Sequence, residues 1–236
     1  MGEPESIRAV RQAEYSGRQG TAKTEHCARF TAAKDEAIRK TKQRLTLELR
    51  AAGEAVSCRR GCNHCCLHYI TASVAEGLVI VDFLYRNEAE LRRFVENYPR
   101  WQARAGTVCT GFDRLRSLAQ ATGTPVEAYR ASVGIAQDEY AAMAVGCPFL
   151  TGPGDCAIYA VRPLACAIHC SVDPPEKCAP DSLQAPKCYN VVPDEMDIAA
   201  LSGFWKPGWS AMSMTMPAMV YGLLTRGNAF IDESLG

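Results

Sequence analysis

The residues of this chain that are best able to do chemistry are its cysteines. Twelve occur among 236 residues, and most fall into two groups, one between positions 58 and 66 and one that begins at position 147. Thiols gathered this closely need either one another, as disulfides, or a metal ion. We interpret both groups as metal ligands. The candidate ligands are Cys58, Cys62, Cys65, Cys66, Cys147, Cys156, Cys166 and Cys170.

The spacing within the first group is typical of a metal-binding loop. Cys62 and Cys65 stand in a C-x-x-C arrangement, and Gly61 allows the tight backbone that such a turn requires. Cys65 and Cys66 are neighbours, whose side chains usually point apart, so both can be ligands only at a sharp bend or for different metal atoms. Four ligands saturate one tetrahedral zinc ion. Eight clustered thiols therefore predict two zinc ions or a polynuclear iron–sulfur centre.

The first residues, the lack of a long apolar stretch and the net charge indicate the compartment and the partners to expect. The first residues include acids and no apolar run, which argues against a secretory signal peptide. No stretch approaches the roughly 18 apolar residues of a membrane span. We therefore expect a cytoplasmic protein without a membrane partner, in which cysteines stay reduced and bind metal. Lys and Arg together number 26, as do Asp and Glu, so no nucleic-acid partner is expected.

The second group carries a longer pattern than the first. It reads Cys147-Pro-Phe-Leu, then Cys156-Ala-Ile-Tyr, then Arg162-Pro before Cys166. Together with the first group, these motifs resemble the YkgJ-like cysteine cluster proteins, a family described as zinc- or iron-chelating domains. The resemblance covers residues 56 to 172. The chain departs from the family pattern at two positions. Many members carry arginine where this chain has Ala167, and Cys170 lies outside the common pattern.

The resemblance implies metal chelation, but it does not imply a particular enzymatic reaction. We expect zinc or iron as the cofactor, with an iron–sulfur cluster as one form, because thiolates suit both metals. The favoured function is a metal-binding protein with a structural, redox or metal-handling role. A related cysteine pattern in the flagellin lysine methylase makes an iron–sulfur-dependent group-transfer enzyme an alternative, although no G-x-G-x-x-G nucleotide loop is present. A metal-folded interaction module is a further alternative, and no specific protein partner is indicated.

Several other residues near the cysteines have a possible functional role and a possible structural role. Arg162 is placed either to offset thiolate charge or to make an ordinary salt bridge, and Tyr159 is expected to pack. Cys27 and Cys109 are isolated and are expected in the core. Sequence spacing does not separate ligands from bystanders among Cys178, Cys188, His64, His68 and His169.

Apolar periodicity and capping signals predict the elements that must hold these loops. Residues 22–52 read as an amphipathic helix ended by Gly53 and separated by Gly17 and Gly20 from a weaker helical segment at 7–15. A capping box at Ser73 to Glu76 predicts the start of the next helix. Further helices are expected through residues 91–98, with Pro99 ending or kinking the helix, and at 109–121, 125–145, 195–203 and 210–225.

These elements predict a mainly α fold whose helices surround a loop-rich, cysteine-ligated metal centre, with little or no β-sheet. The proline-rich stretch 147–193 contains six of the cysteines and needs cross-links to be held in place. We divide the chain into an N-terminal helical segment, 1–55, a cysteine-cluster domain, 56–193, with intervening helices at 73–145, and a C-terminal helical segment, 194–236.

Overall fold

The computed structural model describes residues 17–122, 139–152, 154–179, 182–204, 213–227 and 229–230. The predicted mainly helical fold is confirmed. The helices are α2 (Gly17–Ala51), α3 (Val74–Arg86), α4 (Glu88–Thr122), α6 (Leu164–Ile168), α7 (Glu195–Ser202) and α8 (Met216–Arg226), with 3-10 turns η1 (His64–Leu67) and η2 (Pro175–Cys178). The strands are β1 (Thr71–Ser73), β2 (His169–Ser171), β3 (Cys188–Asn190) and β4 (Ser213–Thr215).

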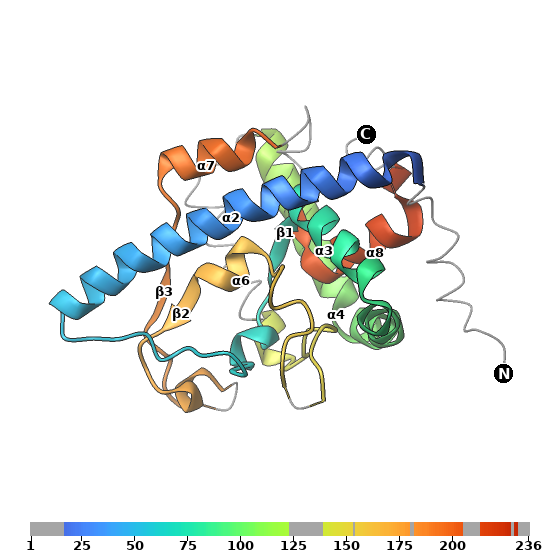
Figure 1. Cartoon of the computed structure of the whole chain (residues 1–236). Coiled ribbons are helices and arrows are strands. Elements are labelled where there is room, and N and C mark those ends of the chain that lie inside the picture. Colours follow the sequence, from blue (N-terminus) through green and yellow to red (C-terminus); the bar gives the residue numbers. More distant parts are fainter. Residues whose placement is uncertain are drawn as a thin grey trace.

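Helix α2 crosses the whole molecule (Figure 1). Helices α3, α4 and α8 lie beneath its N-terminal half, whereas α6 and the antiparallel β2–β3 pair lie beneath its C-terminal half. Helix α7 lies against α2, and a second antiparallel pair joins β1 to β4. The cysteine-bearing loops occupy the space below α2, so this helix spans both the apolar core and the candidate site. None of the described helices combines the length and apolarity that crossing a membrane requires.

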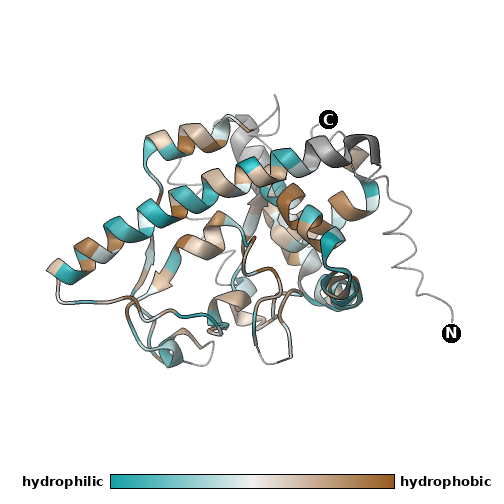
Figure 2. Ribbon diagram, in the orientation of Figure 1, coloured by the Kyte–Doolittle hydropathy of each residue, from teal (hydrophilic) through white to brown (hydrophobic). Residues whose placement is uncertain are grey.

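One face of α2 is buried because apolar residues recur at spacings of three and four. Phe30, Ala37 and Leu45 are all buried, and much of the remaining surface of the helix is hydrophilic (Figure 2). The helix begins at Gly17, so the predicted break at Gly20 was wrong. A single glycine inside a helix costs only about 1 kcal/mol, which this long helix tolerates. The weaker helical segment predicted at 7–15 lies outside the described residues.

Helix α3 begins at the predicted capping box, and most of its side chains are buried. The backbone N–H of Ser73 donates to Glu76 Oε2 at 2.8 Å, and the N–H of Glu76 donates to Ser73 Oγ at 3.3 Å. Two helix N–H groups that would otherwise be unpaired are thus satisfied. The helix packs against α2, α4 and α8, and Glu76 of the capping box accepts the N–H of Leu164 from the second cysteine-bearing segment.

Helix α4 corrects the prediction of two separate helices, because it continues through Pro99 to Thr122. Proline inside a helix costs about 3 kcal/mol. Burial of the aromatic stripe outweighs this cost, since each buried large side chain contributes roughly 1.5–3 kcal/mol. The stripe includes Tyr98, which stacks on Tyr221 of α8 at 3.9 Å, and Phe94, which stacks on Phe149 at 4.3 Å.

Two further boundaries differ from the predictions. Helix α8 begins at Met216 instead of residue 210, because Pro217 favours the first turn of a helix and residues 213–215 pair with β1. Of the helix predicted over 125–145, residues 123–138 lie outside the described residues, and 139–142 are helical. Its end at 142 precedes a turn in which Ala144 has a φ of 48°. The stretch 147–193 is rich in loops, as expected, but includes α6, η2 and the β2–β3 pair.

Replacing Gly77 by alanine is expected to lower the free energy of unfolding by about 1–2 kcal/mol. A Cβ atom at Gly77 would lie 2.7 Å from both Leu223 Cδ1 and Met219 Cγ, so α3 and α8 would have to separate. Gly111 in α4 is the matched control, because nothing lies within 4 Å of its Cβ position. Alanine there should raise the free energy of unfolding by about 0.5–1 kcal/mol. Urea denaturation measures both variants, and equal stabilisation would contradict the close helix contact.

Candidate metal centre

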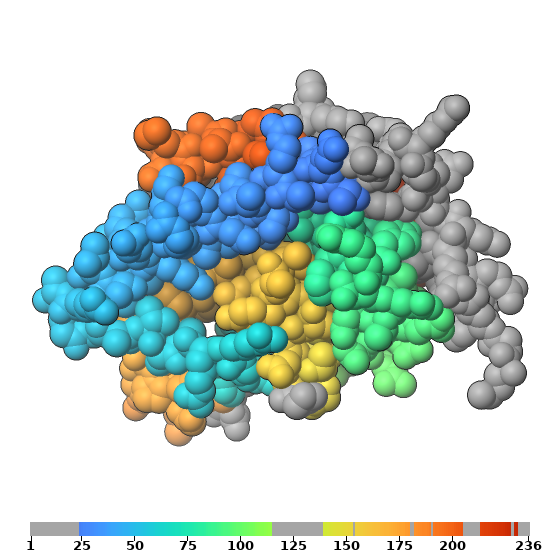
Figure 3. Space-filling model, in the orientation of Figure 1, coloured from blue at the N-terminus to red at the C-terminus, as the bar shows by residue number. Residues whose placement is uncertain are grey.

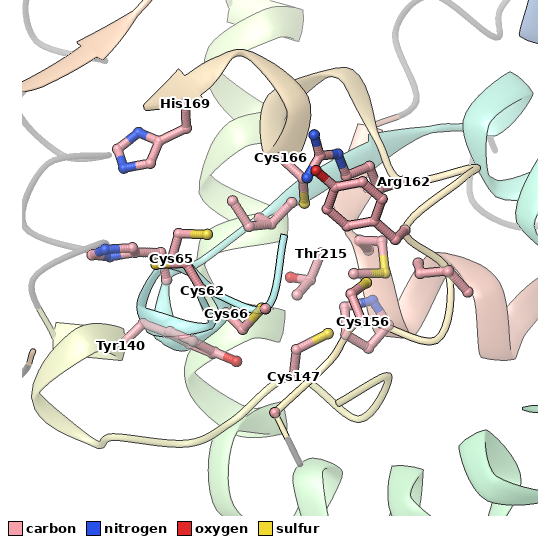
Figure 4. A pocket seen from close by; sticks show the side chains of 18 residues that line it. Cys62, Cys65, Cys66, Tyr140, Cys147, Cys156, Arg162, Cys166, His169 and Thr215 are labelled. Carbon is pink, nitrogen blue, oxygen red and sulfur yellow. The ribbon is translucent and has the colours of Figure 1, made fainter. Parts of the chain in front are cut away.

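Six cysteine side chains from both groups line one cavity in the interior of the loop region (Figure 4). Figure 4 shows the sulfur atoms of Cys66, Cys147 and Cys166 directed into the space in front of Thr215. The six cysteines are Cys62, Cys65, Cys66, Cys147, Cys156 and Cys166. The two groups, far apart in sequence, therefore meet in the fold.

Backbone contacts bring the two groups together. The segment around residues 55–70 lies beside the segment around 150–165 on one face of the molecule (Figure 3). The N–H of Cys147 donates to the carbonyl of Cys66 at 3.0 Å, which joins the second group directly to η1. Gly61 has a φ of 87°, the left-handed conformation that the preceding turn needs and that glycine adopts without strain. The predicted role of Gly61 is thus confirmed.

Three of the cavity cysteines share one local geometry. In each, a backbone N–H two residues further along donates to the cysteine sulfur. The donor and acceptor pairs are His64 to Cys62, Phe149 to Cys147 and Ile158 to Cys156. Hydrogen bonds from amides favour the thiolate over the thiol, and thiolates are the form that binds metal. Three separate turns thus direct a backbone amide donor at a cysteine sulfur that lines one cavity.

Burial acts against the thiolate form. It raises the pKa of the Cys147 thiol to about 12 and raises the pKa values of Cys156 and Cys166. Cys65 and Cys66 form a hydrogen-bonded pair, in which the pKa of Cys65 is lowered and that of Cys66 is raised. Without an added cation, most of these thiols therefore stay protonated near neutral pH. A metal ion would have to displace their protons.

Arg162 brings a positive charge to the cavity wall. The Arg162 guanidinium stacks on the ring of Tyr159 at 3.9 Å, and Arg60 lies over the same ring at 5.4 Å. Arg162 interacts electrostatically with three cavity thiols and lines the cavity, which is the position that an offset of thiolate charge requires. Tyr159 packs, as predicted. Its packing partner is the guanidinium of Arg162, and the sequence did not indicate this cation–π contact.

The loop that carries Arg162 is clamped between two helices. Lys34 on α2 is 1% exposed, and its ammonium donates to the carbonyls of Val161 at 3.2 Å and Arg162 at 2.8 Å. From α3, Glu76 Oε1 accepts the N–H of Leu164 at 2.7 Å. Burial lowers the pKa of Lys34, which Glu76 opposes. Lys34 was missed by the sequence analysis, although it falls on the buried stripe of α2.

A buried carboxylate lies behind the cavity. Asp113 Oδ1 accepts hydrogen bonds from Tyr69 Oη at 2.7 Å and from the Thr215 N–H at 2.9 Å. Its Oδ2 accepts from Thr215 Oγ1 at 2.9 Å. Because Thr215 lines the cavity, this network ties α4 and β4 to the site. Spacing alone gave no signal for Asp113, since an isolated aspartate in a helix usually faces solvent.

The remaining candidates lie outside the cavity or at its edge. Cys58 is exposed, and Cys170 is buried in a small apolar cluster with Leu45 and Leu49. Of the histidines, His68 and His169 line the cavity, with their ring centroids 5.6 Å apart, whereas His64 is not among its lining residues. Cys27 and Cys109 are buried in the core, as predicted.

All twelve cysteines are free thiols. Within the described part of the chain, no three His, Cys, Asp or Glu side chains stand together in a ready-made metal-binding group. The six thiols thus share a cavity without forming a closed coordination sphere, and the ligand assignment stays a prediction.

Comparison with known proteins gives no identification, because no protein-family model, curated protein or solved structure matches this chain. The resemblance in cysteine spacing therefore also stays a prediction.

Replacing Asp113 by alanine is expected to destabilise the fold by about 3 kcal/mol or more, because it leaves buried donors on Tyr69 and Thr215 unpaired. Tyr69→Phe removes one hydrogen bond and should cost only about 1–2 kcal/mol. Urea denaturation of both variants gives the order. If Tyr69→Phe costs as much as Asp113→Ala, the carboxylate is not the centre of the network.

Proposed function

We propose that this chain is a metal-binding protein that holds zinc or iron through the cysteines of its two groups. The observation that carries the proposal is the shared cavity, which six thiols line from segments more than eighty positions apart, at 62–66 and 147–166. Apolar side chains would fill such a space more cheaply than thiols if packing were the only requirement. Clustered, reduced thiols have their commonest use as ligands for zinc or iron–sulfur centres.

The size of the cavity agrees with a small inorganic occupant. It leaves about 60 Å³ of free space. Pockets for organic ligands are usually about 300–1,000 Å³. The described cavity therefore suits metal ions better than an organic substrate.

The donor set agrees with both zinc and iron. More than four thiols line the cavity, so they exceed what one tetrahedral zinc ion needs. The amide donors to Cys62, Cys147 and Cys156 would stabilise bound thiolates, and Arg162 would offset their negative charge. When bound, a metal would supply a cross-link between the two cysteine-bearing segments. This arrangement supports a structural, redox or metal-handling role.

A second candidate function, an enzyme that uses the centre, is favoured by an adjoining pocket of about 260 Å³. It shares Cys62, Cys65 and Arg162 with the cavity and is also lined by Lys42 and Arg59, while none of the described residues that line it is acidic. Such a pocket suits an anionic group next to the metal. Anaerobic purification separates the candidates: a brown, iron-containing protein favours iron–sulfur chemistry, and a colourless zinc protein favours the structural or metal-handling role.

Serine at Cys66 or Cys166 is expected to reduce the metal bound per chain. Loss of a thiolate ligand should weaken metal affinity by more than the roughly 10–100-fold that loss of an outer hydrogen-bond partner costs. Cys27→Ser is the matched control, because Cys27 is buried in the core away from the cavity. Metal content of the anaerobically purified variants is measured by elemental analysis. Full occupancy in both Cys66→Ser and Cys166→Ser, or loss of metal in Cys27→Ser, would overturn the assignment.

Removing the metal with a chelator is expected to expose the segment 148–193 to proteases before the helices. Metal binding energy contributes to folding where the loops have no other cross-link, whereas α2 and α3 have buried faces of their own. Limited proteolysis with mass spectrometry, with and without chelator, locates the first cuts. A cleavage pattern unchanged by chelator would mean that something other than metal holds the segment.

A further inference from the structure

Outside the cavity, two cysteines approach each other beside the β2–β3 pair, and a third lies near them. The thiols of Cys178, at the end of η2, and Cys188, at the start of β3, lie within hydrogen-bonding reach of each other. Cys58 is close enough to interact electrostatically with both. These residues come from three separate segments of the chain, and neither Cys178 nor Cys188 lines the cavity described above.

The backbone register explains why they meet. Ser171 in β2 is paired with Cys188 in β3. The N–H of Ser171 donates to Cys58 Sγ at 3.1 Å, and its carbonyl accepts the N–H of Ser57 at 2.8 Å. Both backbone groups of Ser171 therefore face residues 57–58, and the Ser171–Cys188 pair is the close, non-hydrogen-bonded kind. Residues 57–58 thus run along one edge of β2 while β3 runs along the other.

Asp173 holds η2 against the same ribbon. Its Oδ1 accepts from Lys177 Nζ at 3.1 Å, and its Oδ2 accepts from the Lys187 N–H at 2.7 Å. Lys177 and Lys187 are the residues immediately before Cys178 and Cys188. One carboxylate therefore fixes the two positions from which these thiols approach each other.

Cys62 lines the cavity and is also a neighbour of this group. It interacts electrostatically with Cys58 and with Cys178, and also with Cys65 inside the cavity. Its sulfur accepts the N–H of His64. Elements η1 and η2 are in contact, which agrees with this position. Apart from Cys62, which interacts with both, the clustered thiols thus fall into an outer set at the ribbon and an inner set in the cavity.

We propose that Cys58, Cys62, Cys178 and Cys188 form a second metal site, which takes one zinc-type divalent ion. The inner cavity then keeps five thiols of its own, Cys65, Cys66, Cys147, Cys156 and Cys166. This inference rests on the proposed metal-binding function and adds the division of its ligands. Cys58 and Cys62 form one pair of ligands, and Cys178 and Cys188 form the other. Together they match the four-cysteine set of a structural zinc site, which leaves no open coordination position. The outer site cross-links the first cysteine loop to η2 and β3.

The experiment counts metal ions on the full chain, loaded anaerobically with Zn²⁺ alone or with Co²⁺ alone. Cys178→Ser and Cys188→Ser should each lose one ion per chain while the Co²⁺–thiolate absorption of the inner site remains. Cys66→Ser should show the converse loss, and Cys27→Ser should keep the wild-type count. In the wild-type chain, bound Zn²⁺ should protect Cys178 and Cys188 from alkylation, a measurement that needs no variant to fold.

The outcomes separate this inference from the function on which it rests. Wild-type metal counts in Cys178→Ser and Cys188→Ser, with alkylation of both thiols unaffected by Zn²⁺, would overturn the outer site and leave the inner site standing. Loss of all metal from both Cys178→Ser and Cys66→Ser would show one shared centre and overturn the division. A Cys178–Cys188 disulfide in the anaerobically purified chain would also overturn it. A wild-type chain that binds neither ion would contradict the metal-binding function itself.

Discussion

The arrangement of the site depends on a clamp between Lys34 of α2 and Glu76 of α3. The buried ammonium holds the carbonyls of Val161 and Arg162, and the carboxylate holds the N–H of Leu164. A buried charge is tolerated only when it is paired and hydrogen-bonded, so this geometry is tightly constrained. The clamped loop carries the arginine of the cavity and leads into α6, which contains Cys166. The packing of α2 against α3 therefore helps to set the position of Cys166.

The cavity sets two physical effects against each other. Burial favours neutral thiols, as the raised pKa values of Cys147 and Cys166 show. Amide donors and Arg162 favour thiolates. A divalent cation would decide this balance by replacing protons, because its attraction for several thiolates exceeds what a single arginine supplies. Metal affinity would then depend on pH and be coupled to the folding of the loops.

The two halves of the molecule are stabilised in different ways. Beneath the N-terminal half of α2, large apolar side chains of α3, α4 and α8 form a continuous core. Beneath its C-terminal half, the apolar cluster around Leu45, Leu49 and Cys170 is small, and short strands and turns replace long helices. Cross-links through metal would compensate for the missing burial there. A bound metal would thus give the clustered cysteines a structural role as well as a chemical one.

The sequence alone determined the helical class, the capping box at Ser73 and the inward face of α2, because these depend on periodicity and local hydrogen bonds. It also picked out the thiols of the cavity, since their spacing is unusual. Only the tertiary structure decided that α4 continues through Pro99, that Lys34 and Asp113 are buried, and that Cys178 approaches Cys188. Each of these depends on packing or pairing between distant segments, and the free energy of such contacts is not encoded in local spacing.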